Sequence, residues 1–134
     1  VGRSRADADL ALGALRHTQG GGCVAGVADV LADVLALHSA DVLEAVDRYS
    51  PLSALTAFDR AHNAELVASA RAYLAHGGDV ADAAASLHVH SNTLRNRLRR
   101  ASRSCGVDLD DVDTRLVLML HLKVDALRPV SRMT

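Results

Sequence analysis

The chain has 134 residues, enough for one small domain or for one domain with part of another. Its formal net charge is −1, aromatic residues make up only 2%, and alanine, leucine and valine dominate, a mixture that favours helices over sheets. No apolar run reaches the roughly 18 residues of a membrane span and no signal peptide opens the chain, so we expect a cytoplasmic protein without a membrane segment. Because the first residue is Val1 rather than Met, an upstream domain has to be considered.

Residues 1–50 show helical patterns without a distinctive motif. Apolar spacing predicts one helix over residues 6–18, a second over 24–38 and a third, capped by Asp41, that runs to Tyr49. Gly20-Gly21-Gly22 separates the first two, and the start of the second, CVAGVADV, also fits a short strand. We interpret this region as the tail of a preceding regulatory domain or as a helical extension.

Residues 51–134 are predicted to form a separate helical domain. Pro51 to Phe58 is expected to be a connector, because Ser50-Pro51 disfavours helix at the residue before proline. Four helices are then predicted from their caps and apolar stripes: one capped by Asn63 and ended by Gly77-Gly78, one from Val80 to Leu87 capped by Asp79, one from Ser91 to Ser104 capped by Ser91, and one capped by Asp110 with the stripe Leu116, Val117, Leu120, Val124 and Leu127.

The segment VADAAASLHVHSNTLRNRLRRA, residues 80–101, meets the packing needs of a helix-turn-helix unit. Small side chains on the first helix allow the second to cross it closely, and apolar residues end the first helix, fill the turn and seat the second; they are Ala83, Ala84, Ala85, Leu87, Val89, Leu94 and Leu98. His88 stands where such turns often have glycine, and histidine tolerates the left-handed backbone region better than most residues.

On a helical wheel the second helix of this unit has an apolar side and a strongly cationic side. Five arginines lie between Arg95 and Arg103, and no carboxylate occurs between Asp82 and Asp108 to balance them within the segment. Such a helix suits the major groove of DNA, where asparagine and arginine bond base edges and further arginines reach phosphates. We predict base contacts from Asn92, Thr93, Arg95, Asn96 and Arg99, and phosphate contacts from Ser91, Arg97, Arg100 and Arg103.

Residues from about Pro51 to Leu127 resemble the C-terminal helix-turn-helix domain of PucR/CdaR-type bacterial transcriptional regulators. The similar stretches are PLSALTAFD, ELVASARAYLAHGGDVADAAASLHVHSNTLRNRLRRA and GVDLDDVDTRLVLMLHL. Within them LHVHSNTLRNRL corresponds to the family pattern L-x-V-H-x-N-T-L-x-Y-R-L, with matching positions at His90, Asn92, Thr93, Leu94, Arg97 and Leu98. The resemblance implies an all-α, Fis-like helix-turn-helix fold and a cytoplasmic DNA-binding regulator whose effector, if any, is bound by upstream domains.

Two positions depart from the family pattern. Ser91 stands where the family commonly has arginine, so the phosphate contact that an arginine would make at this position is lost. Asn96 stands where the family commonly has tyrosine, so the family's target sequence does not transfer. Because a single helix-turn-helix makes few base contacts, we expect a homodimer on double-stranded DNA with half-sites about 34 Å apart.

Other kinds of site find little support in the sequence. His88, His90 and Cys105 lack a fourth ligand for a metal, Cys23 and Cys105 match no redox spacing, and no nucleophile elbow or phosphate loop is present. We therefore predict no metal, no cofactor and no enzyme activity. The alternative that stays open is a helical dimerisation or protein-interaction module that does not contact DNA, since residues 116–127 are apolar around much of their circumference.

Overall fold

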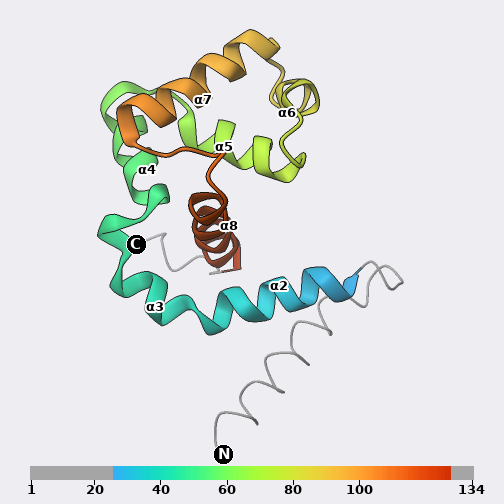
Figure 1. The fold of residues 1–134 in the computed structure, drawn as a ribbon, viewed down its shortest axis with the longest axis vertical. Helices are drawn as coiled ribbons and strands as arrows, with labels where there is room; N and C mark the ends of the chain where they lie inside the picture. The colour runs from blue at the N-terminus through green and yellow to red at the C-terminus, as the bar shows by residue number, and fades with distance from the viewer. Residues whose placement is uncertain (1–25, 128–134) are drawn as a thin grey trace, which may run out of the picture. The chain divides into compact units, whose positions relative to one another are not determined.

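The computed structural model describes residues 26–127, and within this range it consists of helices without any strand. The predicted all-α fold is confirmed for this part of the chain. The elements are α2 (Gly26–His38), α3 (Ala40–Ala45), the 3-10 helix η1 (Asp47–Tyr49), α4 (Pro51–His62), α5 (Leu66–Ala75), α6 (Val80–Ser86), α7 (Ser91–Cys105) and α8 (Val112–Leu127) (Figure 1). The helix predicted over residues 6–18, the three glycines that follow it and Cys23 lie outside the described residues.

The chain divides into two compact units, whose described parts are residues 26–45 with 123–127, and residues 46–122. In the first unit, α2 confirms the second predicted helix from residue 26 onward, and the alternative of a strand is wrong for the residues from there on. An ion pair of 3.0 Å between Lys123 Nζ and Asp33 Oδ1 joins the last turns of α8 to α2. None of the helices in the described part of the chain combines the length and the apolar character needed to cross a membrane.

The third predicted helix is shorter than expected. Helical structure is interrupted at Val46, and only the 3-10 helix η1 covers the last residues up to Tyr49. Asp41 does not cap the helix, because the carbonyl of Ser39 already accepts a hydrogen bond of 2.9 Å from the amide of Leu43. Asp41 therefore lies in the first turn of α3, where a carboxylate still favours the positive end of the helix dipole.

The predicted connector after Pro51 is wrong, since α4 begins at that residue. The hydroxyl of Ser50 accepts a hydrogen bond of 3.0 Å from the amide of Ser53 and so caps the helix. Pro51 occupies the first helical position, where the missing N–H costs nothing and the fixed φ suits a helix. The same dipeptide that ends the preceding segment therefore starts α4.

Asn63 is not the cap of α5, as predicted, but the left-handed residue that closes α4, with φ 50°. Its amide donates a hydrogen bond of 2.7 Å to the carbonyl of Asp59. The carboxylate of Asp59 in turn accepts hydrogen bonds from the amides of Leu66, at 2.7 Å, and Val67, at 3.0 Å. The first amides of α5 are thus capped from the preceding helix, which fixes how α4 and α5 meet.

The helices of the second unit enclose a main core to which α4, α5, α7 and α8 all contribute. Its buried members are Leu55, Leu66, Ala70, Ala101, Val107, Leu109 and Leu118. The stripe predicted for α8 is wrong in part, because Leu116 is 55% exposed whereas Leu118 is fully buried. The sequence of α8 is apolar on several sides, so helical spacing alone selects the wrong row.

The start of α8 differs by one residue from the prediction. Asp111, not Asp110, caps the helix, since its Oδ2 accepts hydrogen bonds from the amide and the hydroxyl of Thr114 at 2.8 and 2.7 Å. These bonds to the charged form lower the pKa of Asp111. Asp108 Oδ1 accepts from the amide of Asp110 and so forms the turn that leads into the cap.

Candidate nucleic-acid interface

Helices α6 and α7 form the helix-turn-helix unit expected from the sequence. The carboxylate of Asp79 caps α6 by accepting from the amide of Asp82 at 2.9 Å, as predicted. Figure 1 shows α6 nearly end-on while α7 runs across the view, so the two helices are not a side-by-side hairpin. Their contact is a small second core of Ala72, Ala83, Ala84 and Leu94, against which Val80, Leu87, Val89 and Leu98 pack.

The turn between α6 and α7 depends on a left-handed histidine. His88 has φ 56°, and its amide donates to the carbonyl of Ala85 while the amide of Val89 donates to that of Ala84, at 3.1 and 3.0 Å. This pair of bonds is the Schellman closure, which usually employs glycine at the left-handed position. The prediction that His88 replaces glycine there is confirmed.

Helix α7, the predicted recognition helix, begins at Ser91 and ends at Cys105. Ser91 is its first helical residue and not its cap, which is a correction to the sequence prediction. His90 precedes it in an extended conformation, with ψ 148°, and the carbonyl of His90 accepts the first helical hydrogen bond from Leu94 at 3.1 Å. Gly106, with φ 69°, closes the helix at its other end, as expected.

The two sides of α7 differ sharply in exposure. Leu94 and Ala101 are buried in the two cores, and Leu98 packs against both. All five residues predicted to contact bases are exposed, namely Asn92, Thr93, Arg95, Asn96 and Arg99. Of the residues predicted to contact phosphates, Arg100 and Arg103 are exposed, whereas Ser91 and Arg97 are half-buried.

Two asparagine–arginine pairs organise the exposed side. Arg95 Nη1 donates to Asn92 Oδ1, and Arg99 Nη1 donates to Asn96 Oδ1, each at 3.1 Å. The spacing of three residues places each pair on one side of the helix, a turn apart. Both guanidinium groups are thereby held along the helix surface while their remaining N–H donors stay available to an acceptor.

The other arginines of α7 differ in what they contact. Arg97 Nη2 forms an ion pair of 2.8 Å with Glu65 Oε2, and the guanidinium of Arg100 lies 5.3 Å from the ring centroid of Phe58. For Arg103, the described residues provide no ion pair. Sequence reasoning missed the contacts of Arg97 and Arg100, because both partners lie more than thirty residues earlier in the chain.

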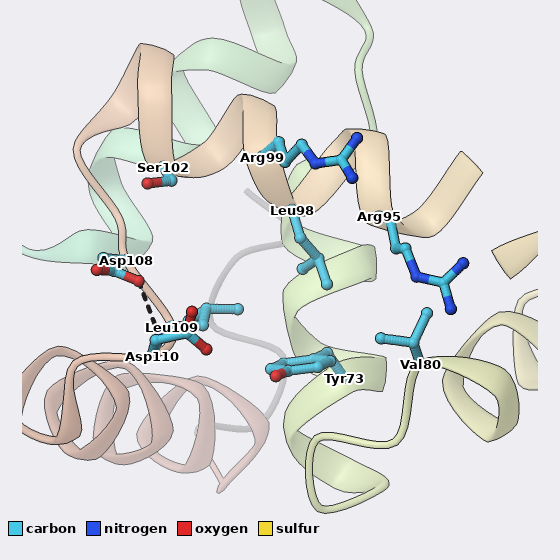
Figure 2. A pocket seen from close by; sticks show the side chains of 9 residues that line it. All are labelled: Tyr73, Val80, Arg95, Leu98, Arg99, Ser102, Asp108, Leu109 and Asp110. Carbon is cyan, nitrogen blue, oxygen red and sulfur yellow. Dashed lines mark hydrogen bonds between the residues drawn. The ribbon is translucent and has the colours of Figure 1, made fainter. Parts of the chain in front are cut away.

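A pocket of about 350 Å³ adjoins this side of α7. Figure 2 shows Arg95 and Arg99 on α7 above it, with Asp108 and Asp110 on the segment that follows α7 and the ring of Tyr73 at its base. Its remaining lining residues are Val80, Leu98, Ser102 and Leu109. Two predicted base-contacting arginines therefore lie at the rim of a hollow of mixed charge.

His88, His90 and Cys105 are not gathered into one cluster of potential metal ligands. No group of three or more histidine, cysteine, aspartate or glutamate side chains suited to a metal is found within residues 26–127. Cys105 packs against the main core, and burial, together with the nearby charge of Asp59, raises the pKa of its thiol. A raised pKa keeps the thiol protonated and unreactive.

Comparison with known proteins matches the same segment. Residues 66–124 match the family described as the PucR C-terminal helix-turn-helix domain. The chain is also similar to the DNA-binding transcriptional activator AdeR of Bacillus subtilis (strain 168), with 32% identity over 73 residues, which are 54% of this chain and 17% of that relative. No solved structure matches the chain. Residues 66–124, which contain α6, its left-handed turn and α7, thus match the helix-turn-helix domain of the PucR C-terminal family.

Proposed function

We propose that this chain is the DNA-binding part of a transcription regulator and that α7 lies in the major groove of its target. The observation that supports this most directly is the cationic character of α7, which carries five arginines, four of them exposed, and no carboxylate, on a helix set across α6 by small residues. The similarity to a DNA-binding transcriptional activator agrees with the proposal, although the chain spans only 17% of that relative.

In this proposal the exposed N-terminal half of α7 reads bases. Asn92 and Asn96 offer amides that can bond adenine, and Arg95 and Arg99 can bond guanine, with about 1–3 kcal/mol of discrimination for each good pair. Thr93 supplies a hydroxyl and a methyl group at the same end. The asparagine–arginine pairs described above hold these four side chains along one exposed surface of α7.

Phosphate contacts are proposed for Ser91, Arg97, Arg100 and Arg103. Arg103 is exposed and can reach a phosphate without giving up an ion pair of the described residues. Arg100 lies over Phe58, so its guanidinium is held in place before DNA arrives. Arg97 is already paired with Glu65, so it can contact a phosphate only when that ion pair opens.

The regulator is proposed to bind as a homodimer on two half-sites and to act in the cytoplasm, without catalysis and with any effector bound elsewhere. Exposed Leu31, Leu35 and Val42 in the first unit favour a further protein contact.

A chain that used these residues alone, as an interaction module, would not be retained on heparin. Salt-dependent retention on heparin or random DNA supports the DNA-binding function, and passage through both columns without retention supports the interaction module.

The proposed phosphate contact of Arg103 is tested by replacing it with alanine. Arg103→Ala should weaken binding to all duplexes alike and reduce the slope of log K against log salt by about one unit. The matched variant Asn96→Ala should instead change base preference, measured by selecting sites from a random DNA pool. An unchanged slope for Arg103→Ala, or equal losses on every sequence for Asn96→Ala, would contradict the assigned roles.

A further inference from the structure

The connector between α4 and α5 holds a glutamate in an unusual backbone conformation. Glu65 has φ 57° and ψ 36°, a left-handed geometry that is costly for a residue with a long side chain. Its side chain does not cap α5, although it stands at the cap position. Asp59 performs that task by accepting from the first amides of α5. The carboxylate of Glu65 is therefore not required for the local structure that places it.

The Glu65 carboxylate instead reaches the recognition helix. Its Oε2 lies 2.8 Å from Nη2 of Arg97, the one α7 arginine for which an ion pair is found among the described residues. The Glu65 side chain is 61% exposed and that of Arg97 22%. Because the Glu65 side of this pair is open to solvent, the pair contributes little to stability, since ion pairs that water reaches are weak and are screened by salt. It can therefore form and break at little cost.

We propose that Glu65 is an intramolecular competitor of DNA phosphate for Arg97 and that it lowers the affinity of this domain for DNA of any sequence. The inference rests on the proposed function and adds a residue outside α7 that limits it. While the pair is closed, Arg97 is neutralised and a negative charge stands beside it.

A purely structural role for Glu65 predicts the opposite result. If the ion pair served to hold α7 in position, its removal would misplace the helix and weaken binding. If Glu65 competes with phosphate, its removal frees Arg97 for a charge-assisted bond and strengthens binding. The sign of the change in affinity therefore separates the two roles.

The test measures binding of the whole chain to a random-sequence duplex over a salt series, by fluorescence anisotropy. Glu65→Gln keeps the shape of the side chain and removes its charge. We expect binding to tighten about two- to fivefold, the range that corresponds to an exposed ion pair, and the salt slope to steepen by about one unit because one more phosphate is neutralised. Asp113→Asn, which removes one charge from an exposed position in the first turn of α8, is the matched control and should leave the slope unchanged.

A second pair of variants assigns the gain to Arg97. In the background of Arg97→Gln, adding Glu65→Gln should produce no tightening. Should Glu65→Gln unfold the chain, as judged by circular dichroism, Glu65→Asn takes its place, because asparagine tolerates the left-handed region. The inference is overturned if a folded Glu65 variant binds equally or more weakly, or if its gain persists without Arg97. If the wild-type protein shows no salt-dependent binding to DNA, the proposed function is wrong, and this inference is wrong with it.

Discussion

At the scale of single residues, Asp59 joins two helices through its carboxylate and its backbone carbonyl. One of its oxygens accepts from the amide of Leu66 and the other from that of Val67, while its carbonyl accepts from Asn63. Helix starts leave amides without internal partners, and a carboxylate is a strong acceptor for them. Asp59 thus satisfies the start of α5 and closes α4 at the same time.

We expect Asp59→Ala to lower the free energy of unfolding by about 1–2 kcal/mol, the usual cost of losing a helix cap. Asp59→Asn keeps one acceptor oxygen and should lose less. Urea unfolding followed by circular dichroism measures both. Arg71→Ala on the exposed side of α5 is the control, and its effect should stay within about 0.5 kcal/mol. Equal stability of Asp59→Ala and wild type would contradict the capping role.

His121 is a buried histidine whose pKa is shifted by its surroundings. It is 6% exposed, and its Nε2 has no hydrogen-bond partner among the described residues. Burial lowers its pKa below the ordinary value of 6.5, and the charge of Asp47 opposes this shift. The folded protein therefore binds a proton at this ring less readily than the unfolded chain does.

This shift predicts how stability depends on pH. The contribution of a neutral His121 is fully present above pH 6.5 and is lost as the pH falls toward the lower pKa of the folded state, because the unfolded chain takes up the proton first. Urea unfolding at pH values on either side of 6.5 should show wild type losing more stability on acidification than His121→Leu. Identical pH profiles of the two proteins would rule out this role.

At the scale of elements, the crossing of α6 and α7 is set by the size of two side chains. Ala83 and Ala84 are fully buried where the helices meet, whereas the adjacent Ala85 is exposed. Of these three alanines, only the two buried ones lie in the core that limits how closely α7 approaches.

Ala84→Leu should therefore force the helices apart and cost about 1–3 kcal/mol of stability, as over-packing of a core does. In the proposed function it should also weaken DNA binding, because α7 would be tilted relative to α6. Ala85→Leu adds the same side chain one residue further on and should change stability by less than about 0.5 kcal/mol. Similar effects of the two substitutions, measured by thermal unfolding and by DNA binding, would refute the crossing argument.

The elements that the sequence predicted correctly are those with local signals. Asp79 caps α6 through an amide three residues on, and Gly106 closes α7 because its φ is positive. Helix α4 was missed because Ser50-Pro51 is both a stop for one segment and a start for the next, and local propensity does not decide between the two. The cap from Asp59 could not be predicted, since it acts on amides seven and eight residues away across a change of chain direction.

At the scale of the whole molecule, the charge is unevenly distributed. The chain carries −1 in total, with 16 acidic residues, yet five arginines and no carboxylate lie on α7. A polyanion would be attracted by that helix and repelled by much of the remaining surface, which favours one orientation of approach. The proposed DNA binding therefore needs no overall positive charge.

The sequence by itself determined the helical composition, the helix-turn-helix unit and the chemistry of its exposed side, because these follow from spacing, small residues and caps within a few positions. Only the tertiary structure decided which partners the arginines have. Glu65 reaches Arg97 and Phe58 reaches Arg100 because α4 and α5 fold back onto α7. Contacts between distant segments depend on how the helices pack, and no local pattern encodes them.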